Sequence, residues 1–475
     1  MGNSHGHKSS SRGRNGSEIV DDGPQPDPRA QSASILKLFE KLELTADEGN
    51  THPGELSRKT FENAFHGPLH KFGKLMYKQM LSQTGQVDRD RITREAFVAA
   101  GTAIVSKFSV ADQRKYYFKL FSGGKDYLTK EDALQMVHVS YMLMVSVSKI
   151  TYNHDDRDIK VFEGMVTSMF GIEERLNCTE LEAWLATNCP NMFSGVHNWV
   201  CTVLNGSNLP SEMEARTAHV PQLENFICGQ HCLSLGMAWA LASVLPNCYT
   251  HIAQASQVPG SLSPNQKNPL ITSYHLLLSM NWLPRVQSWS LLYSSERDGL
   301  SKNRFVHHVM SYHGPVLLLL SFEGGNQYCL ALDVPLKEGI QKYGGKDCRL
   351  IQLLPVYRVK QAGAKLVMWN TTSRNCTKGL LIGQDGKPLV LRVDEDFDRI
   401  YHYDVPCAFH RMEVWGCGGD EVKQAQIKQK QWEARDTERQ RTRKLRLEDD
   451  WRENPDKQIL EWGGVRTGSS YLANR

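Results

Sequence analysis

The apolar residues of this chain change their spacing near Trp289, and the change divides the sequence into two unlike halves. From Ser34 to about residue 200 they recur every three or four residues, as in Ile35, Leu38 and Leu42, which predicts amphipathic helices. From Trp289 onward a period of two predicts β-strands. A helical half followed by a strand half indicates an α+β protein.

The same patterns give domain boundaries. Residues 1–34 are rich in Ser, Gly and Pro and predict a disordered tail. The expected order after that tail is a helical domain at 35–204, a linker and helix at 205–260, an antiparallel two-sheet α+β domain at 261–418, a long charged helix at 420–452 and a tail at 453–475.

Turn signals and apolar runs place individual elements within these domains. Turns at Glu323–Asn326 and Gln384–Lys387 each predict a hairpin. Expected strands are Trp289–Tyr293, Val316–Phe322, Tyr328–Val334, Arg349–Leu354, Lys365–Trp369, Leu380–Ile382, Leu389–Val393 and Arg411–Trp415. Expected helices include Lys130–Val147, Cys232–Leu245 and Tyr274–Met280, and the apolar runs in the first two fall short of the ~20 residues that span a membrane.

Two turns of the helical domain have the spacing of calcium-binding EF-hand loops. In Gly85–Ala96 and Phe121–Asp132, Ile92 and Leu128 occupy the central apolar position. Both loops lack the oxygen ligands that the first, third and fifth positions supply to calcium. We therefore expect an EF-hand-like helical domain without calcium chemistry.

Charge and cysteine usage exclude several classes of protein. The chain has 475 residues, with 56 Lys+Arg against 52 Asp+Glu. A net charge of +4 is too small for a chain of this size to attract nucleic acid through its overall electrostatic field. Eleven cysteines are present without a CxxC pair, and the first residues lack the apolar region of a secretory signal. Free thiols in a cytosolic protein are expected, with no nucleic-acid partner.

The search for catalytic motifs leaves one cluster. There is no GxSxG, HExxH or GxGxxG sequence, and residues 339–347 resemble a phosphate loop without its lysine. On a helix, Cys228, His231 and Cys232 would share one face and could hold zinc or act as a thiol centre. The alternatives are a buried, inert cluster and a thiol- or metal-dependent enzyme, and we expect neither cofactor nor metal.

Both ends of the chain carry signals for association. Gly2 after Met1 fits an N-myristoylation signal, and Lys8, Arg12 and Arg14 supply basic residues that would strengthen membrane binding. Near the other end, residues 420–451 contain neither Gly nor Pro and have no continuous apolar stripe, which indicates a solvated helix or one that meets a partner. The residues we expect to contact that partner are Trp432, Arg439, Arg443 and Arg446.

Four segments of the strand half occur in a telling order, namely Trp289–Ser295 (WSLLYSS), Asp298–Ser301 (DGLS), Gly314–Leu320 (GPVLLLL) and Met412–Gly416 (MEVWG). Together they resemble a TLDc domain, the module of oxidation-resistance and TBC/LysM-associated proteins. The resemblance implies a two-sheet domain without an established active site, and it implies docking on the vacuolar proton-pumping ATPase.

The layout of the whole chain is similar to that of the mTOR-associated subtype of these proteins. That similarity implies a non-enzymatic adaptor on the cytoplasmic face of lysosomal or other endomembranes, with a cytosolic pool, which supports mTOR signalling. The alternative is an oxidation-resistance enzyme. Glu413 is a lone carboxylate without a partner acid or base, so we expect it to hydrogen-bond a loop or to contact a protein partner.

Overall fold

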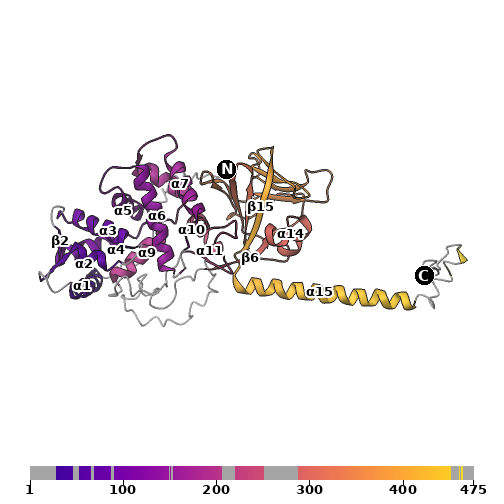
Figure 1. Cartoon of the computed structure of the whole chain (residues 1–475), viewed down its shortest axis with the longest axis horizontal. Helices are drawn as coiled ribbons and strands as arrows, with labels where there is room; N and C mark the ends of the chain where they lie inside the picture. Colours follow the sequence, from indigo (N-terminus) through magenta and orange to yellow (C-terminus); the bar gives the residue numbers. More distant parts are fainter. Residues whose placement is uncertain are drawn as a thin grey trace, which may run out of the picture.

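The computed structural model describes residues 28–45, 53–65, 69–86, 90–148, 150, 153–205, 220–250, 287–450, 459 and 462–463. The helical half lies beside a curled β-sheet, and one long helix projects away from both (Figure 1). The terminal tail up to residue 27, the expected helix at Tyr274–Met280 and, within the expected linker and helix at 205–260, residues 206–219 and 251–260 lie outside the described residues.

The helical half consists of four units, each made of a helix, a short strand and a second helix. Their elements are α1 (Pro28–Leu44), β1 (Glu55–Ser57) and α2 (Arg58–Asn63); α3 (His70–Gln83), β2 (Arg91–Thr93) and α4 (Arg94–Val105); α5 (Val110–Phe121), β3 (Tyr127–Leu128) and α6 (Lys130–Val147); and α7 (Asp156–Phe170), β4 (Leu176–Asn177) and α8 (Cys178–Asn188). β1 pairs with β2 and β3 with β4, both antiparallel, so the four units form two pairs.

The second helix of every unit begins in the same way. Its N-cap residue accepts a hydrogen bond from a backbone N–H in the first turn, which satisfies a donor that the helix itself cannot pair. The four caps are Ser57, Thr93, Thr129 and Asn177. A repeated cap directly after a repeated strand fixes where each second helix starts.

Two further helices pack against the two pairs. In α9 (Ser194–Asn205), Trp199 lies 6.0 Å from Phe65 and 6.1 Å from Phe72, measured between ring centroids. In α10 (Leu235–Val244), Trp239 packs between α6 and α7 against Tyr141 and Phe162, at 5.8 and 5.9 Å. α10 is apolar on every side because it also faces the sheet.

The strand half forms one continuous antiparallel sheet instead of the two sheets expected from the sequence, in the order β10-β9-β8-β7-β15-β14-β13-β12-β11. Its strands are β6 (Ser288–Ser294), β7 (Val316–Phe322), β8 (Asn326–Leu332), β9 (Arg349–Leu354), β10 (Arg358–Ala362), β11 (Val367–Asn370), β12 (Gly379–Ile382), β13 (Leu391–Val393), β14 (Arg399–His402) and β15 (Val405–Gly416). β15 pairs with β14 through its first half and with both β7 and β6 through its second half. The sheet therefore curls around β15, and β5 (Gln222–Leu223) adds a parallel edge beside β6.

β7 is buried on both faces and joins the two halves of the molecule. Leu318 and Leu320 belong to the core inside the curled sheet, whereas Leu317 and Leu319 belong to the core shared with the helical half. A strand covered on both faces reads as a continuous apolar run, and Val316–Leu320 is such a run. Between these layers, α7 contributes Gly164, whose carbonyl accepts from the backbone N–H of Tyr357.

Short elements complete the described chain. They are α11 (Asn247–Thr250), α13 (Ser295–Asp298), α14 (Lys302–Val309) and the 3₁₀ turn Glu323–Gly325, while α15 (Gly419–Asp450) is the projecting helix. No helix within the described ranges is long and apolar enough to span a membrane.

Most expected elements are present, with specific differences. All eight expected strands appear, and β7 and β9 have the expected bounds. β10 and β14 were not expected, because short polar strands such as Arg358–Ala362 lack an apolar alternation. Helix α1 begins at Pro28, inside the segment expected to be a disordered tail, and Cys232–Ser234 precede α10 instead of belonging to it.

Candidate functional site

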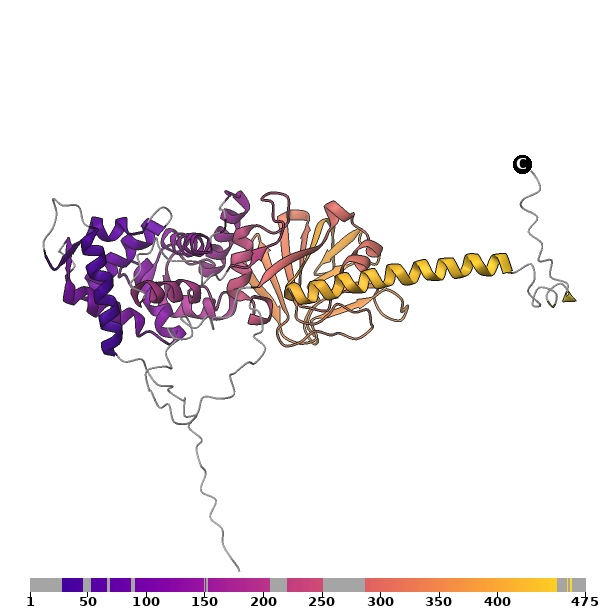
Figure 2. The ribbon, with the colours of Figure 1, turned by 90° about the horizontal axis from the view of Figure 1, so that it is seen from below.

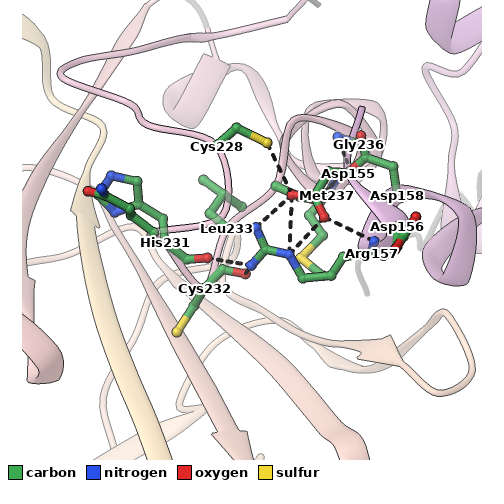
Figure 3. A network of polar contacts seen from close by, with 12 residues as sticks. Asp155, Asp156, Arg157, Asp158, Cys228, His231, Cys232, Leu233, Gly236 and Met237 are labelled. Carbon is green, nitrogen blue, oxygen red and sulfur yellow. Dashed lines mark hydrogen bonds and ion pairs between the residues drawn. The ribbon is translucent and has the colours of Figure 1, made fainter. Parts of the chain in front are cut away.

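The segment before α10 is a turn, and this corrects the prediction of a helix there. Residues 228–232 form turns and bends, and Gly229 has a φ of +83°. As a result Cys228, His231 and Cys232 do not share one face, and their side chains point in different directions (Figure 3). No group of three or more His, Cys, Asp or Glu side chains in the described part of the chain could hold a metal ion.

Arg157, at the start of α7, fastens this turn to the helical half. Its guanidinium is paired with Asp155, with 2.7 Å between Nη2 and Oδ2, and it donates to the carbonyl oxygens of His231 and Cys232 (Figure 3). The hydrogen bond from Arg157 lowers the pKa of Asp155, despite the opposing effect of burial. The pair is therefore charged at neutral pH. Arg157 supplies hydrogen bonds to two carbonyl groups that lie outside any helix and so have no partner within one.

Asp158 closes the other end of the turn. Its buried carboxylate accepts hydrogen bonds from the backbone N–H of Gly236 at 2.8 Å and from the hydroxyl of Tyr141 at 3.0 Å. Gly236 lies in the first turn of α10, where a negative charge is stabilised by the helix dipole. Burial raises the pKa of Asp158 even so, although the hydrogen bonds from Ser234 and Gly236 oppose the rise.

Glu413, on β15, contacts the turn from the side of the sheet. It is 1% exposed, and its Oε2 accepts from the indole N–H of Trp415 at 3.2 Å and from the backbone N–H of Leu233 at 3.4 Å. The other oxygen, Oε1, lies 3.4 Å from Nδ1 of His231, so Glu413 is not the lone carboxylate expected from the sequence but has an imidazole beside it. Each of these contacts is made within the protein, and the hydrogen bond from Leu233 ties Glu413 to the turn that precedes α10.

The thiols near this turn are poor nucleophiles. Burial, together with the charge of Asp155, raises the pKa of Cys228, and burial raises the pKa of Cys232 to about 12. A thiolate is the reactive form of cysteine, and a raised pKa keeps the thiol protonated. The arrangement therefore gives no support to thiol chemistry at these positions.

The loop at residues 339–347 is filled by the protein's own carboxylate. Asp333 accepts hydrogen bonds from the backbone N–H groups of Gly345, at 2.8 Å, and of Asp347, at 3.0 Å. A β-carbon at Gly345 would lie 2.2 Å from Asp333, so the contact requires glycine. Backbone donors of the kind that bind a phosphate are thus occupied by Asp333.

The other predicted contact residues lie on α15, far from Glu413. Trp432 is 59% exposed, and Arg439 is also exposed. Arg443 and Arg446 belong to the same helix, but their side chains lie outside the described part, as does Gly2. The structure thus separates two candidate regions: the buried junction around Glu413 and the projecting helix.

Residues that sequence reasoning missed hold the junction together. Arg157 and Asp158 were not singled out, because the turn that they bind lies 74 to 78 positions further along the chain. Glu224, which lies outside the junction, was missed for the same reason, since its partner Lys423 is 199 positions away. The one local signal is the charged run Asp155–Asp158, three aspartates and one arginine at a helix start, where N-cap residues are common.

Comparison with protein families agrees with this architecture. The family model of the TLDc domain matches residues 265–418, the region that contains β6 to β15. This match supports a TLDc-domain protein. A search of curated proteins found no match to the chain.

Proposed function

We propose that this chain is a non-enzymatic adaptor of the mTOR-associated EAK-type group of TLDc proteins. In this proposal it docks on the vacuolar proton-pumping ATPase and supports mTOR signalling at the cytoplasmic face of the lysosome, with a cytosolic pool. The observation that carries the proposal is the combination of a TLDc domain with a polar helix, α15, whose outer part projects from the body of the protein (Figure 2). A helix that is polar almost all round and projects from a domain is suited to a contact with a partner.

The geometry of the junction supports a role without catalysis. Glu413 is buried among internal hydrogen-bond partners, and the thiols of Cys228 and Cys232 are held in their protonated form. An active site needs acid, base or nucleophile groups that a substrate can approach. In this structure those candidate groups connect the two halves of the molecule instead.

We propose further that the four helix–strand–helix units are EF-hand-like units that work without calcium. In the predicted loop Phe121–Asp132, the twelfth residue is Asp132, a position that usually binds the metal. Asp132 instead accepts a hydrogen bond from Nζ of Lys125 at 3.2 Å and another from the backbone N–H of Thr129 at 3.1 Å. The ammonium group of Lys125 supplies the positive charge that calcium would bring.

Attachment to the membrane would come from acylation of Gly2 together with the basic residues that follow it. One acyl chain gives only marginal binding, so the basic residues and the pump would each add to it. A Gly2→Ala variant keeps the fold and cannot be acylated, so we expect it to move to the cytosolic fraction. An unchanged membrane fraction would refute the anchor.

The test of the proposed function is recovery of the pump. The full chain, expressed with an affinity tag, is expected to retain subunits of the vacuolar ATPase after purification at physiological salt. A tagged helical protein of similar size serves as the control for non-specific capture. Absence of every pump subunit from the full-chain sample would overturn the proposed partner.

A further inference from the structure

One face of α3, in the helical half, carries a row of three exposed lysines, Lys71, Lys74 and Lys78. At about 100° per residue they fall within an arc of about 60°, and they occupy about 10 Å of the helix axis. The sequence of α3, HKFGKLMYKQMLSQ, contains no acidic residue. Among the residues that the structure describes, no ion pair involves a lysine of this row. The row is therefore a local concentration of positive charge.

The helix that carries the lysine row is held closely by the rest of the helical half. A β-carbon at Gly73 would lie 2.7 Å from the ring of Phe65, so the helix and this ring are in direct contact. The hydroxyl of Tyr77 donates to the carbonyl of Leu56, on β1, at 2.9 Å. Because these contacts fix the buried side of α3, the lysine row stays on the outside of the molecule.

Charged groups beside the start of α3 do not neutralise the row. Glu62 is the nearest acidic residue before α3 in the sequence, and its carboxylate lies 2.7 Å from Nε of Arg58 and 3.7 Å from Nε2 of His70. On the neighbouring helix α6, partial burial and the positive charge of Lys71 lower the pKa of His138. Neither neighbour thus supplies a free negative charge.

The other end of the row meets the loop Phe121–Asp132. A β-carbon at Gly123 would lie 3.7 Å from Nζ of Lys78, which places this ammonium group beside the loop. The loop carries two lysines and three acidic residues, and one of these acids, Asp132, is paired with Lys125 at 3.2 Å. Its charges nearly cancel, so the loop marks the edge of the basic surface and the excess positive charge comes from α3.

The side chains of the exposed face favour a membrane over a protein as the partner. Protein interfaces are depleted in lysine and are anchored by arginine and aromatic residues. The exposed positions of α3 hold none of these anchors; they are His70, Lys71, Lys74, Lys78, Ser82 and Gln83. A lysine keeps its hydration beside anionic headgroups and is attracted by their negative surface potential without a fixed partner. Such a face suits contact with headgroups instead of insertion into a bilayer.

The place of α3 in the molecule suits a protein that is anchored by its first residues. Helix α1 begins at Pro28 and belongs to the same helical half as α3, so the chain enters the body on this side of the sheet. Helix α15 projects from the opposite side of the molecule (Figure 1). A contact between α3 and a membrane therefore leaves the far side of the sheet accessible.

We propose that the lysine row of α3 is a membrane-facing surface that binds the anionic headgroups of a lipid bilayer and turns the helical half toward it. A single acyl chain needs a second attraction for stable anchoring, and the folded body supplies one through this row. The contribution of an acyl chain at Gly2 rests on the proposed function, whereas the attraction of the row to an anionic bilayer does not. Because the attraction is between charges, it weakens as the salt concentration rises.

Vesicle binding without the acyl chain tests the row directly. The full chain with Gly2→Ala cannot be acylated, and we expect it to sediment with vesicles of phosphatidylcholine and phosphatidylserine but not with vesicles of phosphatidylcholine alone. Changing Lys71, Lys74 and Lys78 together to Gln should weaken this binding by roughly tenfold or more. Equal binding with and without the three lysines would overturn the proposal.

Three lysines of the sheet half provide a matched control. Lys346, Lys365 and Lys387 are exposed, and changing them together to Gln removes the same charge from the full chain. Both triple variants should keep the thermal midpoint of the parent, and only the α3 variant should lose vesicle binding. A loss of equal size in the control variant would mean that net charge alone governs binding, and it would overturn the row as a site.

The orientation of the bound protein gives a second readout. Ser82 is exposed and continues the face of the lysine row, whereas Lys387 lies on the sheet half. A spin label introduced at either position as a non-canonical amino acid reports its distance from vesicles that contain a nickel-chelating lipid. Relaxation should be enhanced more strongly at Ser82, and equal enhancement at the two positions would overturn the proposed orientation.

The outcomes separate this proposal from the proposed function. The vesicle assay contains neither an acyl chain nor the pump, so failure of acylation or of pump capture overturns the proposed function alone. Normal vesicle binding by the α3 variant, together with loss of pump subunits, would assign the row to an acidic protein surface and overturn the membrane site.

Discussion

At the scale of single residues, the molecule depends on a few buried polar contacts between segments far apart in sequence. Arg157 and Asp158 belong to the helical half, Glu413 belongs to the sheet, and all three hold the turn that precedes α10. Groups of this kind are costly to leave unpaired in a buried site. Their substitution should therefore change stability before it changes any contact with a partner.

Gly236 tests the contact with Asp158. A β-carbon there would lie 2.6 Å from Oδ1 of Asp158, and the buried carboxylate has no room to retreat. We expect Gly236→Ala to destabilise the protein by about 1–3 kcal/mol, seen as a lower thermal midpoint. Gly339→Ala is the matched control, because a β-carbon there meets no atom within 4 Å. Equal midpoints for the two variants would contradict the close packing of α10 on α7.

Glu413 tests whether the junction is structural or catalytic. Glu413→Gln keeps an oxygen that can accept from Trp415, so we expect a small change in thermal midpoint and undiminished recovery of the pump. Glu413→Ala leaves the indole N–H of Trp415 and the N–H of Leu233 unpaired, which should cost about 1–3 kcal/mol for each donor. A stable Glu413→Gln protein that loses all cellular function would favour catalysis.

The two cysteines of the turn give an independent check on chemistry. A Cys228→Ser, Cys232→Ser double variant should retain pump capture, since neither thiol is poised for reaction. Metal analysis of the unmodified protein is expected to show substoichiometric zinc. Stoichiometric zinc that the double variant lacks would restore the enzyme alternative.

At the scale of elements, the base of α15 combines charge with burial and so depends on pH. Burial alone would raise the pKa of Glu224, but hydrogen bonds from Lys423 and Ser290 outweigh it and hold the pKa below its usual range. A carboxyl group with a depressed pKa contributes stability above its unfolded pKa of about 4.3, and the contribution is lost as the pH falls through the folded pKa. The ion pair with Lys423 is therefore complete at neutral pH.

The direction of α15 can be followed by the distance between spin labels, carried by non-canonical amino acids at exposed Lys387 on the sheet side and Arg441 on the helix. The distribution of that distance should be constant from pH 6 to pH 8 and broaden only in strong acid. Glu224→Gln removes the charge and should loosen the base of the helix at neutral pH, with a visibly broader distribution. A Glu224→Gln protein as narrow as the unmodified chain would show that Gln426 and Lys430, which donate to the carbonyl of His308, suffice to hold the helix.

Sequence patterns predicted the helices and strands whose apolar residues recur at a regular spacing. They missed the elements whose structure depends on contacts with residues far away in the chain. The absence of Gly and Pro from residues 420–451 was enough to predict α15 almost to its bounds. By contrast, β10 and β14 are polar or short and exist because β9 and β15 offer them pairing partners. The junction could not be predicted either. Cys228–Cys232 was expected to be helical, but hydrogen bonds from the distant side chains of Arg157 and Gln327 to the carbonyls of this segment hold it in a turn.

At the scale of the whole molecule, the helical half, the turn and the curled sheet form one continuous body from which α15 projects (Figure 2). Because α10 contributes to the core on both sides, the helical half cannot move far relative to the TLDc region without exposing apolar surface. A rigid body with one projecting helix can make two contacts at once, and two linked contacts bind far more tightly than either alone.

The affinity of the purified pump for two forms of the protein tests this account most directly. One form is the full chain and the other ends at Gln431, which keeps every contact at the base of α15 and removes only its free stretch. The account predicts binding by both forms, weaker by about 100-fold for the shortened one. Equal affinity of the two forms would contradict a contact through α15, and absence of binding by the full chain would contradict the adaptor itself.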